Sequence, residues 1–193
     1  EEINIAIEAG VTDIGENKVQ EIMDKYDDIK PVRWHMIGHL QTNKVKYIID
    51  KVSMIHSVDS YKLAAEINKR AAACGITMDI LLQVNSAQEE SKFGISTEET
   101  EGLIMQILDS CENIRIRGLM CIAPYADDPE DIKKYFDSVK EQYDQFSTID
   151  HPNLDFRYLS MGMSHDFPVA IEAGSNLVRV GSAIFGERDY SKV

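Results

Sequence analysis

Helix and strand signals alternate along nearly all of this 193-residue chain. A helical segment comes first, and seven apolar, strand-like segments then alternate with further helical ones. Alternating β and α units imply a parallel sheet with helices packed outside it. The predicted strands have the sequences TDIG, VRWHMIG, SMIHSV, MDILLQV, IRIRGLMCIA, FRYLSM and NLVRVGSAIFG.

The clearest helix is predicted over residues 129–146. Its apolar side chains recur at steps of four and three residues, which places them on one face: Ile132, Phe136, Val139, Tyr143 and Phe146. The other predicted helices cover residues 1–9, 18–26, 43–51, 60–74, 97–111 and 166–173.

Two parallel architectures fit this order, a doubly wound open sheet and a (β/α)8 barrel. A dinucleotide-binding open sheet would carry GxGxxG in its first βα turn, and the chain has no such motif. Seven strands behind a leading helix resemble a barrel without its first strand. We therefore expect an α/β fold, a (β/α)8 TIM-type barrel with the first strand missing from the given chain. An open seven-stranded sheet is the alternative. The expected organisation is one domain over residues 1–193, incomplete at its N-terminal end.

The pentapeptide AIEAG occurs twice, at Ala6–Gly10 and at Ala170–Gly174. We interpret each copy as the end of an outer helix that turns through its glycine into the next strand. The second copy follows a strand-like segment, FRYLSMGMS, whereas the first follows only EEINI. This asymmetry also predicts a strand upstream of Glu1.

The composition excludes several classes of function. A formal charge of −13 repels polyanions, so we expect no nucleic-acid partner. The chain has no run of about 18 apolar residues, which predicts that it does not span a membrane. Cys74, Cys111 and Cys121 form neither a CxxC nor a zinc-type spacing. They are typical of reduced, mostly buried thiols in a cytoplasmic protein, and we expect no metal site.

The loops after the last two predicted strands are candidates for a ligand site, because parallel barrels bind ligands at the carboxyl ends of their strands. Gly-Met-Ser ends at Ser164 and leads into a helix, and Gly181-Ser182 follows the last strand core. Small residues and unpaired N–H groups at a helix start suit a phosphate dianion. The ordinary alternative is that Ser164 caps its own helix and Gly181 makes room for packing.

Arg179 lies inside the apolar segment NLVRVG. If Val178 and Val180 face the helices, Arg179 faces the barrel interior, where a guanidinium must be paired or meet a ligand. A salt bridge on the helix side is the alternative. His35, in RWHMIG, is predicted to be a packed or hydrogen-bonded core histidine.

At this point several stretches resemble the pyridoxal phosphate homeostasis proteins, small one-domain relatives of the alanine racemase barrel. These stretches are GENKVQE, RWHMIGHLQTNK, SVDS, ESKFG, GLMCIAP and LSMGMSHDFPVAIEAGSNLVRVGSAIFGER. The resemblance runs from the first helix to Arg188. It implies a (β/α)8 barrel that binds pyridoxal 5′-phosphate (PLP) through a Schiff-base lysine on its first strand. Lys18, Lys44 and Lys92 occur in other contexts, so this lysine is expected upstream of Glu1.

The resemblance also implies roles for individual residues. The phosphate would be held by Ser164 and by the backbone amides of Met163, Gly181 and Ser182. Arg179 would face the pyridine nitrogen and, because it stays protonated, would keep that nitrogen unprotonated and weaken the ring as an electron sink. Asn17 would lie near the 3-hydroxyl of the ring, and Met161 would border the pocket.

Three functions follow as hypotheses. The first is a PLP-binding protein for storage, delivery or regulation of the cofactor, with PLP and PLP-dependent apoenzymes as partners, acting as a monomer and without catalytic residues. The second is a PLP-dependent enzyme resembling an amino-acid racemase, which needs an acid or base opposite the lysine. The third is a phosphosugar-type barrel enzyme, for which Asp59 and Glu16 are the only candidate carboxylates at strand ends.

Overall fold

The computed structural model describes residues 1–89 and 93–186, so Lys92 and Arg188 lie outside the described residues. Within these ranges, seven parallel strands form one sheet whose spatial order follows the chain. The strands are β1 Asp13–Glu16, β2 Arg33–Met36, β3 Met54–Val58, β4 Met78–Val84, β5 Ile114–Cys121, β6 Leu154–Met163 and β7 Leu177–Arg179.

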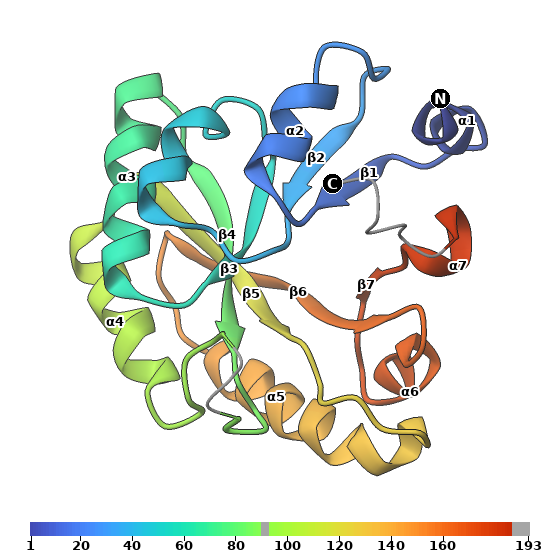
Figure 1. The fold of residues 1–193 in the computed structure, drawn as a ribbon. Coiled ribbons are helices and arrows are strands. Elements are labelled where there is room, and N and C mark those ends of the chain that lie inside the picture. The colour runs from blue at the N-terminus through green and yellow to red at the C-terminus, as the bar shows by residue number, and fades with distance from the viewer. Residues whose placement is uncertain (90–92, 187–193) are drawn as a thin grey trace.

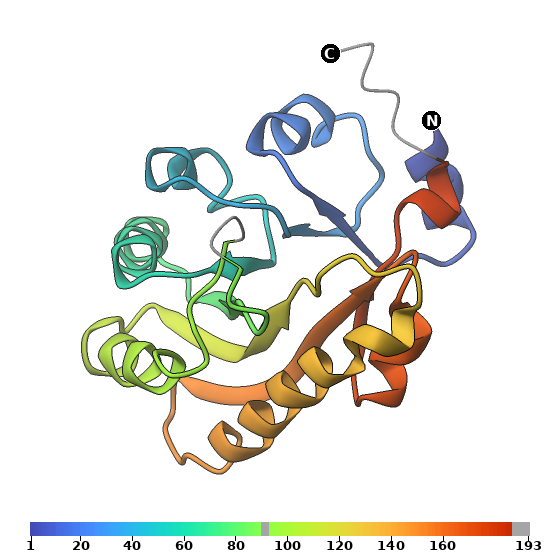
Figure 2. The same ribbon diagram turned by 60° about the horizontal axis from the view of Figure 1, so that its bottom comes forward.

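The sheet curls into a nearly closed barrel with its helices outside. Figure 1 and Figure 2 both show β1 and β7 coming near each other, with the remaining strands completing the curve between them. A doubly wound sheet reverses its strand order at a switch point, whereas this sheet runs from β1 to β7 without reversal. The predicted barrel is confirmed over the open, doubly wound alternative.

Capping residues explain where helices begin and end, as the helix of residues 61–74 shows. Ser60 precedes the helix of residues 61–74 and accepts a hydrogen bond from the backbone N–H of Leu63, and Gly75 ends that helix with a φ of 67°. The helices are α1 Glu2–Glu8, α2 Val19–Lys25, α3 Tyr61–Cys74, α4 Thr100–Ser110, α5 Lys133–Phe146, α6 Phe167–Glu172 and α7 Ser182–Phe185, with 3-10 turns η1 Thr42–Tyr47 and η2 Pro129–Ile132.

Both copies of AIEAG end outer helices as predicted. The first closes α1 and the second closes α6, and in each case the glycine adopts a positive φ, 107° at Gly10 and 99° at Gly174. A side chain is disfavoured at such φ values, which explains why a glycine ends each copy.

Three expectations about local structure need correction. The helix predicted over residues 43–51 is only a 3-10 turn, η1. The helix predicted over residues 129–146 begins as η2 and becomes α-helical at Lys133. The last predicted strand is wrong beyond Arg179, because Ser182–Phe185 forms α7 after Gly181. Ile184 and Phe185 of α7 are exposed, so their apolar character does not reflect a place in the sheet.

Two apolar clusters lie on the two faces of the sheet. Because successive strand residues point to opposite faces, Ile80 packs in the large cluster beside the helices, while Leu81 packs in a small interior one. Phe136, predicted to face inward from its helix, is fully buried in the large cluster. The interior cluster contains Met54, Leu81 and Met120, with Ile122, Tyr158 and Leu177 partly buried against it.

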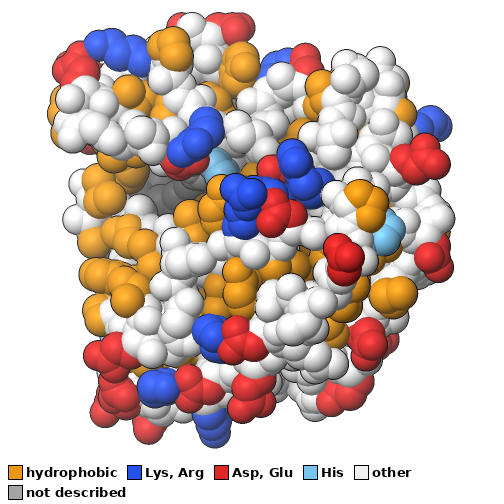
Figure 3. Space-filling view, turned by 180° about the vertical axis from the view of Figure 1, so that it is seen from behind, with side chains coloured by type: hydrophobic (Ala, Val, Ile, Leu, Met, Phe, Trp, Pro, Cys, Tyr) orange, Lys and Arg blue, Asp and Glu red, His pale blue; other side chains and the backbone are white. Residues whose placement is uncertain are grey.

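Ion pairs join neighbouring strands near their starting residues. Figure 3, which views the molecule from behind, shows Lys and Arg side chains grouped with Asp and Glu side chains at the middle of that face. Exposed ion pairs contribute at most about 1 kcal/mol each, so we assign them to strand register rather than to stability. The pairs between strands are Arg33–Asp13, Arg115–Asp79, Arg117–Asp79 and Arg117–Asp155, and Arg157 pairs with Asp155 within β6.

The contact between β5 and β6 depends on Gly118. Its φ is 143°, and a Cβ at this position would lie 1.8 Å from the carbonyl oxygen of Tyr158. We expect Gly118→Ala to lower the free energy of unfolding by about 2–4 kcal/mol, measured by urea denaturation. Gly102→Ala, in the open first turns of α4, is the matched control and should raise it by about 0.5–1 kcal/mol. Equal effects of the two changes would contradict this account.

Candidate ligand-binding site

The loops after β6 and β7 meet at Ser164. Its hydroxyl oxygen accepts hydrogen bonds from the backbone N–H groups of Gly181, at 3.2 Å, and Ala183, at 3.3 Å. Ser164 therefore reaches across to the start of α7 and does not cap its own helix α6, whose N-cap is Asp166. Donor N–H groups of an exposed loop converge here on a single acceptor oxygen, an arrangement that suits an anion.

The two glycines of these loops have different roles. A Cβ on Gly162, whose φ is 93°, would lie 2.8 Å from the Cα of Phe167 and from the Cβ of Ala170, so this glycine allows β6 to approach α6. A Cβ on Gly181 would have no heavy atom within 4 Å. Gly181 is therefore not required by packing among the described residues: its Cβ direction is open, while its N–H donates to Ser164.

The two other predicted amides differ in how they are engaged. The Met163 N–H donates to Oδ1 of the buried Asp166 at 2.6 Å, so that carboxylate already occupies it. Ser182 is the first residue of α7, a position whose N–H has no acceptor within its own helix. The geometry thus brings Ser164, Gly181 and Ser182 together, while the Met163 amide is hydrogen-bonded within its own loop.

Arg179 points into the barrel, as its strand position predicts. Its Nη1 donates to the carbonyl oxygen and the hydroxyl of Ser160, at 2.8 and 2.6 Å, and its Nη2 donates to the carbonyl oxygen of Cys121 at 2.8 Å. Among the described residues no carboxylate lies within ion-pair distance, so the alternative of a helix-side salt bridge is wrong. Burial lowers the pKa of Arg179 from its ordinary value, but a guanidinium remains charged.

Arg179 also keeps capacity for a ligand. A guanidinium has five N–H groups, and three hydrogen bonds to Ser160 and Cys121 use three of them. The other two have no acceptor in the described part of the chain. A cation held by carbonyl and hydroxyl oxygens, with donors left over, can meet an acceptor atom of a bound molecule.

Asn17 and Met161 lie in different surroundings. Asn17 follows β1 and is exposed, and its backbone packs so closely on Gly38 that a Cβ there would lie 2.2 Å from the Asn17 carbonyl oxygen. Met161 is fully buried in the large apolar cluster, which also contains Val169 and Ala170 of α6. The structure therefore holds Asn17 at a strand end but places the Met161 side chain beside the helices.

The two carboxylates of the phosphosugar hypothesis do not converge. Glu16 is buried and pairs with Lys25 of α2 at 2.6 Å, on the helix side of the sheet. Asp59 lies 3.8 Å from Nδ1 of His39, whose ring stacks on Phe93 with centroids 3.8 Å apart. Burial raises the pKa of Asp59. This cluster at the ends of β2 and β3 escaped the sequence analysis, because no spacing pattern joins its members.

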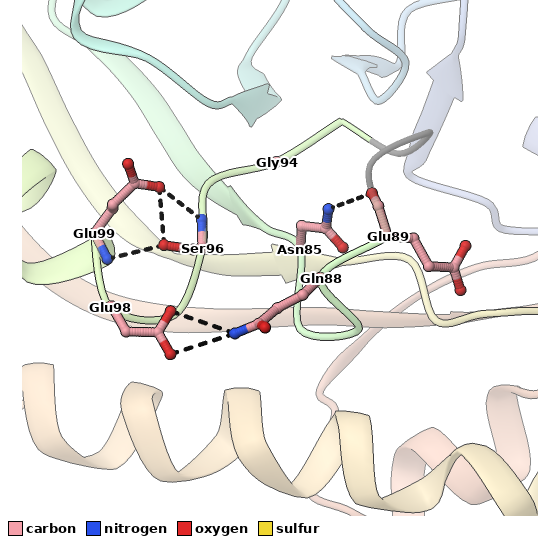
Figure 4. A pocket seen from close by; sticks show the side chains of 7 residues that line it. All are labelled: Asn85, Gln88, Glu89, Gly94, Ser96, Glu98 and Glu99. Carbon is pink, nitrogen blue, oxygen red and sulfur yellow. Dashed lines mark hydrogen bonds between the residues drawn. The ribbon is translucent and has the colours of Figure 1, made fainter.

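A pocket of about 430 Å³ follows β4 (Figure 4). Three of its lining residues are glutamates, which would repel a phosphate dianion. Ser96 and Glu99 hydrogen-bond to each other at the start of α4 as a capping box does, and Gln88 donates to Glu98. This pocket is thus built around helix capping and is not the phosphate site. Its lining residues are Asn85, Gln88, Glu89, Gly94, Ser96, Glu98 and Glu99.

Two further searches of the structure bear on the class of site. Among residues 1–89 and 93–186, no group of three or more His, Cys, Asp or Glu side chains could hold a metal ion. Over the same residues, no helix is both long enough and apolar enough to cross a bilayer. Cys111 and Cys121 are buried free thiols, and Cys74 is an exposed one.

Comparison with known proteins places this geometry in a family. The family model described as the alanine racemase N-terminal domain matches residues 2–189. A pyridoxal phosphate homeostasis protein from Aquifex aeolicus is 46% identical over 183 residues, covering 94% of this chain and 79% of that protein. The human protein of the same name is 36% identical over 197 residues, covering 95% of this chain and 70% of its own length.

Solved structures agree with the sequence comparisons. PipY of Synechococcus elongatus, determined with PLP bound, has a TM-score of 0.84 at 32% identity, covering 95% of this chain and 86% of PipY. An alanine racemase of Clostridium difficile, 15% identical, has a TM-score of 0.70 and matches over 99% of this chain and 50% of its own. At that identity the likeness shows the fold alone.

The family model identifies this parallel barrel as an alanine racemase N-terminal domain, and the chain belongs to that class of domain. Within the class, it belongs to the family of pyridoxal phosphate homeostasis proteins. The resemblance seen in the sequence is thereby confirmed.

The contact between Asp166 and the Met163 N–H generates a test of the loop after β6. We expect Asp166→Ala to lower the free energy of unfolding by about 1–3 kcal/mol, because the Met163 N–H loses its hydrogen bond to a carboxylate. Asp166→Asn should lose less than half as much, because its amide oxygen also accepts a hydrogen bond. Urea denaturation of both variants measures the difference, and equal losses would show that the charge rather than the acceptor holds the loop.

Proposed function

We propose that this protein binds PLP in the barrel and serves PLP homeostasis, by storing, delivering or regulating the cofactor without turnover. The observation that carries the proposal is the inward Arg179, held by Ser160 and Cys121 with two N–H groups still without an acceptor in the described chain. The likeness to PipY, whose structure contains PLP, supports the same ligand.

The phosphate end of the ligand fits the loops after β6 and β7. The Ser164 hydroxyl and the N–H groups of Gly181 and Ser182 would hold it, since two backbone donors already converge on the Ser164 oxygen. The open space beside Gly181 leaves room for phosphate oxygens. The Met163 amide would join them only by leaving Asp166.

The pyridine end fits Arg179. When bound, PLP supplies an aldehyde and an electron-withdrawing ring. A guanidinium donates a hydrogen bond to the ring nitrogen without giving up its proton, so the ring withdraws electrons less strongly than with a carboxylic acid partner. Asn17 would lie near the 3-hydroxyl, and Met161 would support the pocket from behind β6.

The covalent lysine of the family is proposed to lie on a further strand, upstream of Glu1, between β7 and β1. None of the seven described strands contains a lysine, and β1 and β7 each pair with one neighbour only among the described residues. A parallel strand between them would satisfy the backbone groups of both free edges. We further propose a cytoplasmic monomer of one domain that passes PLP to apoenzymes.

The proposal is tested by cofactor retention in the full-length protein. We expect Ser164→Ala and Arg179→Ala each to weaken PLP binding roughly tenfold or more, because each removes a hydrogen bond to a charged or strongly polar group of the ligand. Arg179→Ala should also shift the absorption spectrum of bound PLP, whereas Ser164→Ala should leave it in place. Ser147→Ala, an exposed change at the end of α5, is the control.

Two results would contradict the proposal. The first is full-length protein that neither carries PLP nor takes it up on dialysis against the free cofactor. The second is saturable racemisation of an amino acid by the PLP-loaded protein, followed by circular dichroism, which would favour the enzyme over the carrier.

A further inference from the structure

Five polar residues are hydrogen-bonded end to end through the interior of the barrel. His35 Nε2 lies 2.9 Å from Oδ1 of Asp13, and His35 Nδ1 lies 2.9 Å from Nε2 of His56. His56 Nδ1 lies 3.1 Å from the Ser160 hydroxyl, which accepts from Arg179 Nη1 at 2.6 Å. We call these residues the interior relay: Asp13, His35, His56, Ser160 and Arg179.

The interior relay joins five strands: three of its links connect neighbouring strands, and the link from His56 to Ser160 crosses the barrel from β3 to β6. Its members come from the first residue of β1, the middles of β2, β3 and β6, and the last residue of β7. It therefore runs from the starting end of the strands to the ligand end. His35 is 9% exposed, His56 2% and Ser160 0%, so the middle of the interior relay has almost no water to satisfy it.

The direction of donation is set independently at each end. An ionised carboxylate only accepts, so His35 must donate through Nε2 to Asp13. Burial raises the pKa of Asp13, but hydrogen bonds from Arg33, Thr12 and His35 outweigh it and hold the pKa at about 2. Asp13 is thus ionised at neutral pH, and a neutral His35 then accepts at Nδ1.

The other end leads to the same assignment. Arg179 can only donate, so the Ser160 oxygen is an acceptor toward it and the Ser160 hydrogen must go elsewhere. Within the described chain, His56 Nδ1 is the acceptor in reach of that buried hydroxyl. His56 then carries its hydrogen on Nε2 and donates to His35. Both ends require the same tautomer in both histidines.

Protonation of either histidine would break this order. If His35 Nδ1 carried a proton, it would donate to His56 Nε2, and His56 would then carry its hydrogen on Nδ1. His56 and Arg179 would both donate to Ser160, and the Ser160 hydrogen would lose its acceptor. Burial lowers the pKa of both histidines, and the charge of Arg179 lowers that of His56 further. The groups that face the two rings are Asp13 and Arg33 at His35, and Ser160 and Arg179 at His56.

We propose that the interior relay is a positioning device for Arg179, which fixes the guanidinium so that one of its two remaining N–H groups meets the pyridine nitrogen of PLP. The identity of the ligand in this proposal rests on the proposed function, whereas the hydrogen-bond geometry of the relay does not depend on it. Hydrogen bonds that all point one way polarise and strengthen one another. His56 and His35, which are too deep to touch a ligand beyond Arg179, thereby act on the site through Ser160.

The first test needs no PLP. Nitrogen-15 NMR of the full-length protein at pH 7 should show both His35 and His56 neutral, with hydrogen on Nε2 and a bare Nδ1. The exposed His165, whose Nε2 lies 3.1 Å from the carbonyl oxygen of Ala126, serves as the surface reference outside the relay. A hydrogen on Nδ1 of either relay histidine, or a cationic ring, would overturn the proposal.

The second test measures the guanidinium itself. The Nη groups of Arg179 should rotate slowly in the wild type and at least tenfold faster in Ser160→Ala and in His56→Gln, which retains a donor and an acceptor for folding. Ser57→Ala is the matched control, because Ser57 is a fully buried neighbour of His56 whose hydroxyl has no partner in the described chain. Unchanged Arg179 rotation in both relay variants would sink the proposal.

Titration and PLP uptake separate the two proposals. Below pH about 6.5 the histidines of the unfolded chain bind protons, whereas the buried histidines of the folded relay stay neutral. The free energy of unfolding should therefore decrease as the pH is lowered, and it should decrease less steeply in His56→Gln. An equal slope in His56→Gln would count against the relay. Slow Arg179 rotation in a protein that never takes up PLP would overturn the proposed ligand and leave the relay as the device that orients Arg179.

Discussion

The two-residue alternation of parallel strands is the constraint on which the rest of this structure depends. Each strand sends one set of side chains to the helices and the next set into the barrel. On β7 this rule turns Leu177 and Arg179 inward together, and on β3 it turns His56 inward beside Met54. Because the strands are in register around a curved sheet, residues more than a hundred positions apart become hydrogen-bond partners, as His56 and Ser160 do.

Both apolar and polar side chains fill the barrel interior, and burying the polar ones costs free energy. Met54, Leu81 and Met120 fill one part with close packing. Burying histidines, a serine and a guanidinium in the other part is unfavourable unless every donor finds an acceptor. From Ser160 to Asp13 that requirement is met, because the chain of bonds ends on a carboxylate at the start of β1; two N–H groups of Arg179 remain for a ligand.

Much of the fold was predictable from local pattern. Period-two and period-3.6 repeats located the seven strands and most helices, and the missing GxGxxG turned the choice toward a barrel. The failures share a physical reason. Residues 182–185 are as apolar as a strand, but Gly181 interrupts the ladder and the segment winds into a helical turn instead. At residues 42–47 the apolar pattern likewise does not fix the backbone: Val45 is fully buried in the large cluster, yet the segment stays 3-10.

In the candidate site, too, the sequence pattern established some features and the tertiary structure established others. The sequence by itself determined that Ser164 and Gly181 lie at strand ends and that the chain resembles a PLP-binding family, and it left Arg179 with two possible directions, inward or toward the helices. Only the tertiary structure decided that Ser164 meets the amides of Gly181 and Ala183, that Asp166 occupies the Met163 amide, and that two histidines link Asp13 to Arg179. The reason is that periodicity fixes the direction of a side chain on its own strand, whereas a partner on another strand depends on curvature and register.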